Sequence, residues 1–311
     1  MPELPEVENL RIGLEKYILN QKILKIEVSK PKLVSGNGTK RTASKKKVLE
    51  FIEGLTNAKF LKVERVAKNL IFRLTKDKTI LVHLKMTGQF VYLPSHKATA
   101  RQVNQKSYLE GKIDGGHPIE LSETTLPNKH THIIFELEKG TLYYNDTRMF
   151  GYVLYFENQK EFDKLNHFKK YGLEPLDKNF TVEYFEKSLK AKKSSIKKVL
   201  LDQDIVVGIG NIYADESLFE AGISPNRNAN TLKIKEVEKL HQAIIRIIKR
   251  AIEVGGSSVA TYRLIDEARG NYAREHKVYG KDGEDCYICR KPLKRILIGS
   301  RTTIFCEKCQ K

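Results

Sequence analysis

The chain opens "MPELPEVENL", in which Pro2 is followed by acids at Glu3 and Glu6. We expect Met1 to be removed because a small residue follows it, which leaves the secondary amine of Pro2 next to the Glu3 carboxylate. An amine and a neighbouring carboxyl group can act as a nucleophile and its acid. The alternative is structural, because Pro5 and Glu6 also suit the first turn of a helix.

A second group of reactive residues lies near the other end, in "CYICRKPLKRILIGSRTTIFCEKC". Two Cys-x2-Cys pairs, Cys286 with Cys289 and Cys306 with Cys309, are separated by sixteen residues. Two tight turns can bring four thiolates into a tetrahedron, which suits Zn²⁺ better than disulfides or free thiols. The spacer is basic and contains no acid, and no open ligand position is left. We therefore expect one structural zinc ion that holds a basic hairpin.

A glycine turn in "GIGNIYADE" joins two segments with helical patterns. Gly208 and Gly210 form the turn, and Asn211 opens the second segment. A turn before a helix N-terminus leaves backbone N–H groups free for an anion, to which a side-chain amide can add. The alternative is a helix turn with an asparagine cap. On a basic chain we favour contact with a phosphate.

The charge of the chain makes a polyanion the leading partner. Its 311 residues include 56 Lys and Arg against 38 Asp and Glu, which gives a net charge of +18 and a pI near 9.5. Neutralising phosphates releases counterions, so binding to nucleic acid should be sensitive to salt. Anionic membranes or RNA would also suit this charge, but no polybasic amphipathic helix is evident. The absence of an 18-residue apolar run excludes a transmembrane helix, and without an export signal we expect a cytoplasmic protein.

Hydrophobic periodicity predicts a chain with a β-rich first half and a helical second half. The first element is an amphipathic helix over 6–18, with its apolar residues at Val7, Leu10, Leu14 and Ile18. Strands are predicted at 22–28, 59–66, 69–75, 79–86, 132–138, 141–146 and 152–157. Their close spacing indicates a sandwich or barrel. We interpret 94–128 as a long surface loop and the "KKK" at 45–47 as a solvated loop.

The period changes after about residue 176. Helices are predicted at 181–190, 194–202, 211–222 and 234–256, the last ended by a glycine pair. Around the cysteines the pattern returns to short strands and turns.

Seven short motifs then match one family in order and in approximate spacing. They are "MPELPEVE", "AKNLIF", "HLKMTG", "KHTH", "DTRMFG", "GIGNIYADE" and "FCEKCQ". Together, from Pro2 to Gln310, they resemble formamidopyrimidine-DNA glycosylase, a repair enzyme for oxidised purines. The resemblance implies an α+β fold with a β-sandwich domain at 2–160, a helical helix-two-turn-helix domain at 161–274 and a zinc-finger hairpin at 275–311. It also implies a monomer that acts on damaged double-stranded DNA.

The same resemblance implies a bifunctional enzyme that removes formamidopyrimidines and 8-oxoguanine and then cleaves the abasic site by β,δ-elimination. Pro2 would attack C1′ to form a Schiff base, with Glu3 as the general acid and base. Glu6 would tune this site. Lys68 would bind a phosphate beside the lesion and support catalysis, although without the family a strand-edge lysine in solvent is an equal alternative.

An enzyme of this kind must flip the damaged nucleotide and fill the space that it leaves. The resemblance assigns this role to Met86, Arg148 and Phe150, since apolar side chains replace lost stacking and arginine can bond to the widowed base. The alternative for Met86 and Phe150 is an ordinary place in the core.

Further residues are implied to hold the DNA around the flipped nucleotide. His83, Asn211 and Arg301 would bind phosphates. The segment "SSVATYRLIDEARGNYAREHKVYG" would cover the base, with Gly270 giving mobility and Tyr272 an aromatic face.

Two alternatives stay open. One is an endonuclease VIII-type glycosylase for oxidised pyrimidines, whose usual start has glycine where this chain has Leu4. The other is a non-catalytic zinc-containing DNA-binding protein on the same scaffold.

Overall fold

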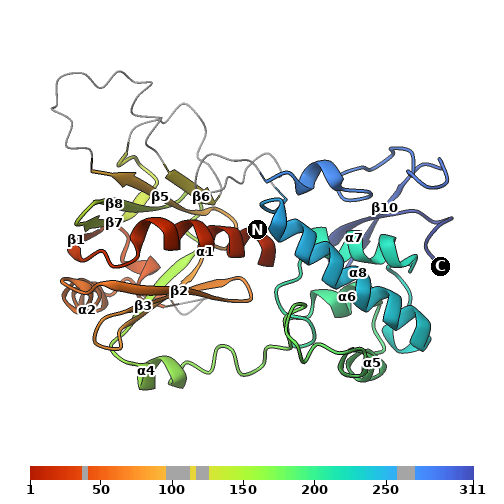
Figure 1. The fold of residues 1–311 in the computed structure, drawn as a ribbon, viewed down its shortest axis with the longest axis horizontal. Coiled ribbons are helices and arrows are strands. Elements are labelled where there is room, and N and C mark those ends of the chain that lie inside the picture. Colours follow the sequence, from red (N-terminus) through yellow and green to blue (C-terminus); the bar gives the residue numbers. More distant parts are fainter. Residues whose placement is uncertain (37–40, 96–112, 117–125, 258–269) are drawn as a thin grey trace. The chain divides into compact units, whose positions relative to one another are not determined.

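A computed structural model of the chain describes residues 1–36, 41–95, 113–116, 126–257 and 270–311 (Figure 1). The described chain divides into two compact units. The first comprises Met1–Pro2, Glu6–Leu165 and Ser257–Gly270. The second comprises Glu3–Pro5, Asn166–Gly256 and Asn271–Lys311, and so includes the segment with the cysteines.

The first unit contains two antiparallel sheets. The larger has the order β1-β7-β8-β5-β6, and the smaller has the order β2-β3-β4-β9. The strands are β1 (Ile23–Val28), β2 (Phe60–Val66), β3 (Asn69–Leu74), β4 (Thr79–His83), β5 (Gly88–Pro94), β6 (Ile113–Gly116), β7 (Thr131–Leu137), β8 (Gly140–Asp146) and β9 (Tyr152–Phe156). Every strand predicted from the sequence is present.

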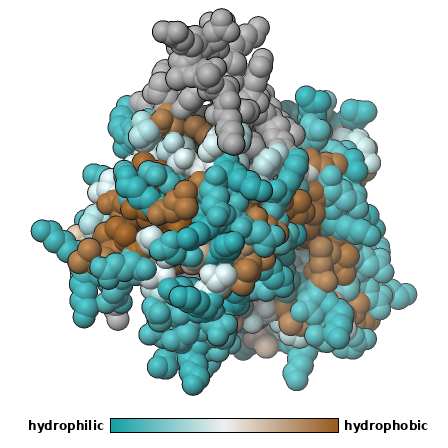
Figure 2. All heavy atoms as spheres, turned by 60° about the vertical axis from the view of Figure 1, so that its left-hand side comes forward, coloured by the Kyte–Doolittle hydropathy of each residue, from teal (hydrophilic) through white to brown (hydrophobic). Residues whose placement is uncertain are grey.

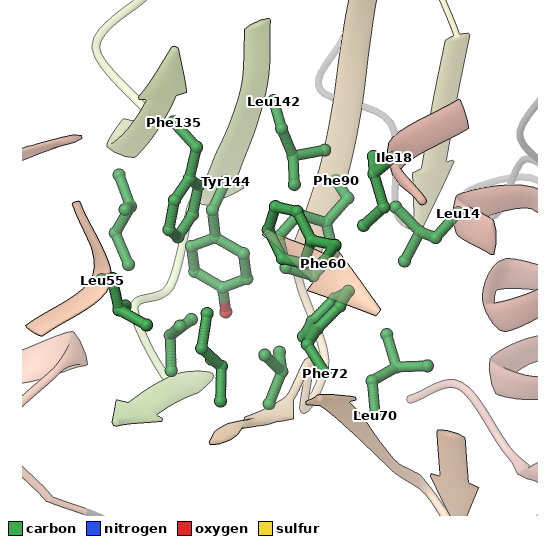
Figure 3. Close-up of a cluster of buried hydrophobic side chains, with 14 of the residues drawn as sticks. Leu14, Ile18, Leu55, Phe60, Leu70, Phe72, Phe90, Phe135, Leu142 and Tyr144 are labelled. Carbon is green, nitrogen blue, oxygen red and sulfur yellow. The ribbon is translucent and has the colours of Figure 1, made fainter. Parts of the chain in front are cut away.

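Aromatic side chains from both sheets meet in one core (Figure 3). The ring of Phe72 on β3 lies edge-on to Phe90 on β5, with 5.8 Å between ring centroids. Phe90 in turn lies 5.2 Å from Tyr144 on β8. Such edge-to-face pairs are favourable beyond the area that they bury. Because the contact joins the inner faces of two sheets, the β-sandwich prediction is confirmed.

Helix α1 (Leu4–Ile18) begins two residues earlier than predicted. The four apolar residues predicted for its inner face are all buried, with at most 1 % exposure. Their spacing of three and four residues places them along one stripe, which packs in the sandwich core.

Two interpretations in this unit were wrong. Residues 45–47 are not a loop but the first turn of α2 (Lys45–Leu55), which Ser44 caps by accepting a hydrogen bond from the Lys47 N–H at 3.2 Å. Phe51 and Leu55, four residues apart, bury its inner face.

The segment 94–128 is also not wholly a loop, because it contains β6, which pairs with the preceding strand β5. Strand β5 was not predicted from the sequence, because its first five residues are all buried and show no alternation of polar and apolar positions. Residues 96–112 and 117–125 lie outside the described residues.

The helices of the second unit match their predicted ranges closely. They are α5 (Val182–Lys190), α6 (Ile196–Leu201), α7 (Asn211–Ala221) and α8 (Ile234–Glu253), and they are followed by a hairpin of β10 (Lys294–Ile298) and β11 (Arg301–Phe305). The second unit also contains the short helical segments η3 (Ala229–Thr231) and η4 (Tyr272–Glu275), and the first unit contains η1 (Pro31–Leu33) and α4 (Gln159–Lys164). The unit has one core among its helices and a smaller one around the cysteines.

Helix α7 lies at the centre of this unit and is buried over most of its length. A helix enclosed in this way must pair its polar residues internally, and it contains the buried acids Asp215 and Glu216.

Hydrophilic residues make up most of the molecular face shown in Figure 2, with a smaller apolar area among them. Among the described residues, no helix is long and apolar enough to cross a membrane.

Candidate functional site

The N-terminal residues precede the first turn of α1. Pro2 is buried, whereas Met1 is 48 % exposed. Glu3 is 4 % exposed. A buried carboxylate needs hydrogen-bond partners, because the cost of removing it from water is otherwise large.

The Glu3 carboxylate finds these partners at the N-terminus of α7. Its Oε2 accepts a hydrogen bond from the Gly210 N–H at 2.7 Å, and its Oε1 accepts one from the Ile212 N–H at 3.0 Å. The backbone N–H groups of Gly210 and Ile212 are therefore already bound to an anion, which corrects the prediction that they are free for a phosphate. The helix dipole favours this anion. No sequence pattern predicts this pairing, because the partners are 207 residues apart.

The glycines of the turn make room for this arrangement. A Cβ atom on Gly210 would lie 2.5 Å from Oε1 of Glu3. Gly208 has a φ of +94°, which favours glycine, and its carbonyl accepts a hydrogen bond from the Leu4 N–H at 3.0 Å.

Asn211 does not cap its own helix but bonds to the hairpin. Its Nδ2 donates to the Thr302 carbonyl at 2.9 Å. Arg301, the residue before Thr302, is exposed. The structure therefore brings together the first residue of α7 and the start of β11, two of the four positions predicted to contact phosphates.

Lys197 on α6, which the sequence analysis missed, reaches the same strand. Its Nζ lies 2.6 Å from Oδ1 of Asp215 and donates to the Thr303 hydroxyl at 2.8 Å and to the Thr302 carbonyl at 3.1 Å. The lysine and the aspartate have side-chain exposures of 0 % and 1 %. This ion pair thus ties α6 and α7 to the strand that carries Arg301.

Burial is the largest influence on both members of this pair. It raises the pKa of Asp215 to about 7, against the opposing effect of the Lys197 charge. It also lowers the pKa of Lys197. The only sequence signals were an acid inside "GIGNIYADE" and the first of two adjacent lysines in "SSIKKVLL", and neither indicates the pairing.

Glu216, the next residue of α7, fixes the backbone that leads toward the cysteines. Its carboxylate accepts hydrogen bonds from the N–H groups of Lys277 at 2.8 Å, Val278 at 3.0 Å and Tyr279 at 2.8 Å. The sequence analysis assigned it no role.

The position of Tyr272 differs from the prediction. Its ring is 5 % exposed and packs against Tyr213, with 5.6 Å between centroids, as part of the helical core. It therefore offers no aromatic face to a base in this structure. Gly270 is buried, and residues 258–269 of the predicted covering segment lie outside the described residues.

In the first unit, Glu6 is 2 % exposed and accepts a hydrogen bond from the Ser257 N–H at 2.7 Å. Lys68 lies in the turn between β2 and β3 and is 7 % exposed, which contradicts the alternative of a strand-edge lysine in solvent. His83 ends β4, and its Nδ1 accepts a hydrogen bond from the Lys85 N–H at 3.0 Å.

The three residues predicted to fill the space of a flipped nucleotide form one exposed cluster. Met86 and Phe150 are 43 % and 46 % exposed, so the alternative of an ordinary core position is wrong. The Arg148 guanidinium donates to the Met86 sulfur at 3.2 Å and stacks on the Phe150 ring at 4.5 Å from its centroid. We call Met86, Arg148 and Phe150 the wedge.

The four cysteines are free thiols whose Sγ atoms all lie within 4.8 Å of one another. Two of the distances, Cys286 to Cys309 and Cys289 to Cys306, are 3.9 and 3.5 Å. Tetrahedral zinc with Zn–S bonds of about 2.3 Å requires sulfurs about 3.8 Å apart. The four thiols can therefore hold one metal ion in a closed site.

The first unit is thus a β-sandwich with the wedge exposed, and the second is a helical unit with a four-cysteine hairpin. Comparisons with known proteins assign this combination to the class of DNA glycosylases with a helix-two-turn-helix domain. The family model "Formamidopyrimidine-DNA glycosylase N-terminal domain" matches residues 1–153, and the model "Formamidopyrimidine-DNA glycosylase H2TH domain" matches residues 171–263.

Individual relatives match over the whole length. A formamidopyrimidine-DNA glycosylase of Ligilactobacillus salivarius is 38 % identical, with 100 % of this chain and 99 % of that protein covered. The Lactococcus lactis Fpg bound to DNA with an abasic site has a TM-score of 0.80 at 32 % identity, covering 99 % of each chain. A variant of that Fpg bound to DNA containing Fapy-dG has the same score and identity, with 100 % of each chain covered.

The chain belongs to the formamidopyrimidine-DNA glycosylase family of base-excision repair enzymes, which remove oxidised purines from DNA and cleave the abasic site. The pyrimidine-specific alternative is not favoured by these relatives.

Proposed function

We propose that the Pro2 amine is the nucleophile with which this enzyme opens damaged nucleotides. The observation that supports it is the buried Glu3 carboxylate, which the N-terminus of α7 holds immediately after Pro2. A carboxyl group fixed next to a terminal amine is suited to moving protons for that amine.

In the proposed reaction the amine attacks C1′ of the deoxyribose, and the bond from C1′ to the damaged base breaks. The base departs with a proton. The C1′–O4′ bond then opens, Glu3 delivers a proton to O4′, and the nitrogen and C1′ form a cationic iminium. This cation accepts electrons when a proton leaves C2′, so the 3′ phosphate is expelled. A second elimination expels the 5′ phosphate, and water releases the sugar fragment from Pro2.

Two other buried groups of the first unit are assigned supporting roles. Glu6 helps to set the protonation of the site, and Lys68 binds a phosphate next to the lesion through its compact ammonium group. Both side chains are almost fully buried, which favours a specific role over general solvation.

Binding to DNA is assigned to residues from both units. The wedge fills the stack after the nucleotide has flipped. His83, Asn211 and Arg301 bind phosphates, with Arg301 presented by the hairpin. Because most of this binding is electrostatic on a chain of net charge +18, affinity for undamaged duplex should fall steeply with salt.

We assign one structural zinc ion to Cys286, Cys289, Cys306 and Cys309. When bound, it supplies no chemistry to the reaction and fixes the base of the hairpin. Four adjacent thiols remain reduced in a reducing compartment, which supports a cytoplasmic location.

Borohydride trapping tests the proposal. Purified protein is incubated with a duplex containing one 8-oxoguanine opposite cytosine, reduced with borohydride and digested, and the crosslinked peptide is mapped. An adduct on Pro2 is the expected result. An adduct only with a 5-hydroxyuracil or dihydrouracil duplex would shift the substrate to oxidised pyrimidines, and none with any lesion or abasic site would indicate a DNA-binding protein without catalysis.

A further inference from the structure

The turn between β8 and β9, which carries two of the three wedge residues, has an unfavourable backbone conformation. Met149, between Arg148 and Phe150, has a φ of +53° in the left-handed region. A residue with a Cβ atom enters this region at a cost that the surrounding structure must offset. The side chains of Arg148, Met149 and Phe150 are all exposed, so burial of side chains does not stabilise this backbone conformation.

The N–H groups of the turn are held by Asp146 at the end of β8. Its Oδ1 accepts hydrogen bonds from Arg148 at 3.2 Å and Met149 at 3.0 Å, and its Oδ2 accepts one from Gly151 at 2.8 Å. The Thr87 hydroxyl donates to the same Oδ1. Because Thr87 follows Met86, this one carboxylate also joins the two segments of the wedge.

Two carbonyl groups of the turn are held by a residue from a distant segment of the same unit. Arg41 donates from Nη1 to the Met149 carbonyl at 2.9 Å and from Nη2 to the Phe150 carbonyl. The partners are 108 and 109 residues away in the chain. A planar guanidinium can hold two successive carbonyls in a fixed orientation, whereas an ammonium is a single point of donation.

We infer that Arg41 is a positioning residue that sets the wedge for insertion, acting on the backbone of the turn while Asp146 acts on its N–H groups. The inference rests on the proposed role of the wedge in base flipping. With Arg41 bound to two carbonyls of the turn and Asp146 bound to three of its N–H groups, the left-handed Met149 lies between two fixed points. Arg148 and Phe150 are then already oriented before DNA arrives, which lowers the ordering cost of insertion.

The wedge acts only where a partner strand is present, and this gives a sharp test. An abasic site in a single strand has no opposite base, so its cleavage requires the nucleophile but not the wedge. We would measure kcat/KM on an 8-oxoguanine duplex and the rate of cleavage of a single-stranded abasic oligonucleotide, for Arg41→Ala, Arg41→Lys and wild type.

Arg73→Ala is the matched control. Arg73 on β3 makes side-chain hydrogen bonds to Glu64 at 2.8 Å, Thr79 at 3.1 Å and Gln159 at 2.7 Å, and none of these residues belongs to the wedge turn. Melting temperatures of all variants check folding, and Arg41→Gln provides a second substitution should Arg41→Ala not fold.

We expect Arg41→Ala to lower kcat/KM on the duplex by about tenfold or more, and to leave single-strand cleavage near the wild-type rate. Arg41→Lys should show the same loss, because it cannot hold both carbonyls. Arg73→Ala should match wild type on both substrates.

Three results would overturn the inference: unchanged duplex activity in Arg41→Ala, equal loss on both substrates, or full rescue by Arg41→Lys, which would indicate a charge acting directly on a phosphate. A wild-type protein that cleaves neither substrate would instead refute the proposed function, and the positioning role would fall with it.

Discussion

The Glu3 carboxylate and the Gly210 N–H are joined by a 2.7 Å hydrogen bond between the third residue of the chain and the residue that caps α7. The bond places an acid of the N-terminal motif and the glycine of "GIGNIYADE" in one structural feature. Gly210 leaves space for the carboxylate, and the N-terminus of the helix favours its charge. The N-terminal motif and "GIGNIYADE" therefore meet at the Glu3 carboxylate.

Gly210→Ala should therefore impair catalysis by displacing Glu3. Gly210 has φ −134° and ψ −156°, which are extended angles that alanine also adopts. The substitution therefore disturbs the site only through its new Cβ atom, which would lie 2.5 Å from Oε1 of Glu3. We expect cleavage of an abasic duplex to slow by about tenfold or more, since small displacements of catalytic groups have effects of this size. Gly280→Ala is the comparison, because it introduces backbone strain at a φ of +80° but its Cβ atom would meet nothing within 4 Å and would leave Glu3 in place. Equal rates for the two variants would argue against the role of Glu3.

Pro2→Gly should remove most of the catalytic activity and leave DNA binding largely intact. The substitution replaces the secondary amine while keeping the chain length and the Glu3 contacts with α7. Cleavage of damaged duplex and fluorescence anisotropy with undamaged duplex measure the two properties. If the variant still cuts damaged duplex at the wild-type rate, the nucleophile has been assigned to the wrong residue.

Lys197→Met should destabilise the protein strongly, by about 3–5 kcal/mol, because Asp215 is then left as an uncompensated buried charge. Adding Asp215→Leu to this variant should recover part of the loss, since two apolar side chains need no ion pair. Wild type, Lys197→Met, Asp215→Leu and the double variant form a double-mutant cycle, and their free energies of unfolding are measured by urea denaturation. Additive losses would show that the two residues do not act as a pair.

Cys306→Ser should release the metal and weaken binding to DNA. Cys306 is fully buried and belongs to the small core beneath the hairpin, so a missing ligand loosens the strand that carries Arg301. Zinc content by elemental analysis and affinity for duplex DNA are measured on the same sample. Unchanged metal content and affinity would refute the assignment of the hairpin to zinc.

His276 should make folding sensitive to mild acid. Burial lowers the pKa of His276 to about 4, below the ordinary value of 6.5. Between these two pKa values His276 binds a proton in the unfolded chain but not in the folded protein. The free energy of unfolding that is present above about pH 6.5 is therefore lost as the pH falls toward the pKa of the folded state. The expected loss in the free energy of unfolding is about 2 kcal/mol between about pH 7.5 and about pH 5. His276→Gln should remove this part of the pH dependence, and urea denaturation at both pH values shows whether it does.

Local sequence determined the elements of this protein and its metal-binding cysteines. The apolar stripe of α1 and the helices from α5 to α8 follow from periodicity within a single segment, which depends on neighbouring residues only. The two Cys-x2-Cys pairs likewise predict a cluster because each pair needs just one tight turn. The "KKK" in α2 and the buried β5 were misjudged, since their identity depends on what they pack against.

Tertiary structure alone decided how the site is held. The bonds from Glu3 to the start of α7, from Lys197 to Asp215 and from Arg41 to the wedge turn join residues that the sequence pattern does not connect. It also decided that Met86 is exposed and that Tyr272 is buried, although both are single apolar or aromatic residues with no local pattern. The physical reason is that burial and hydrogen bonding depend on the three-dimensional surroundings of a side chain, whereas periodicity and motif spacing report only its neighbours along the chain.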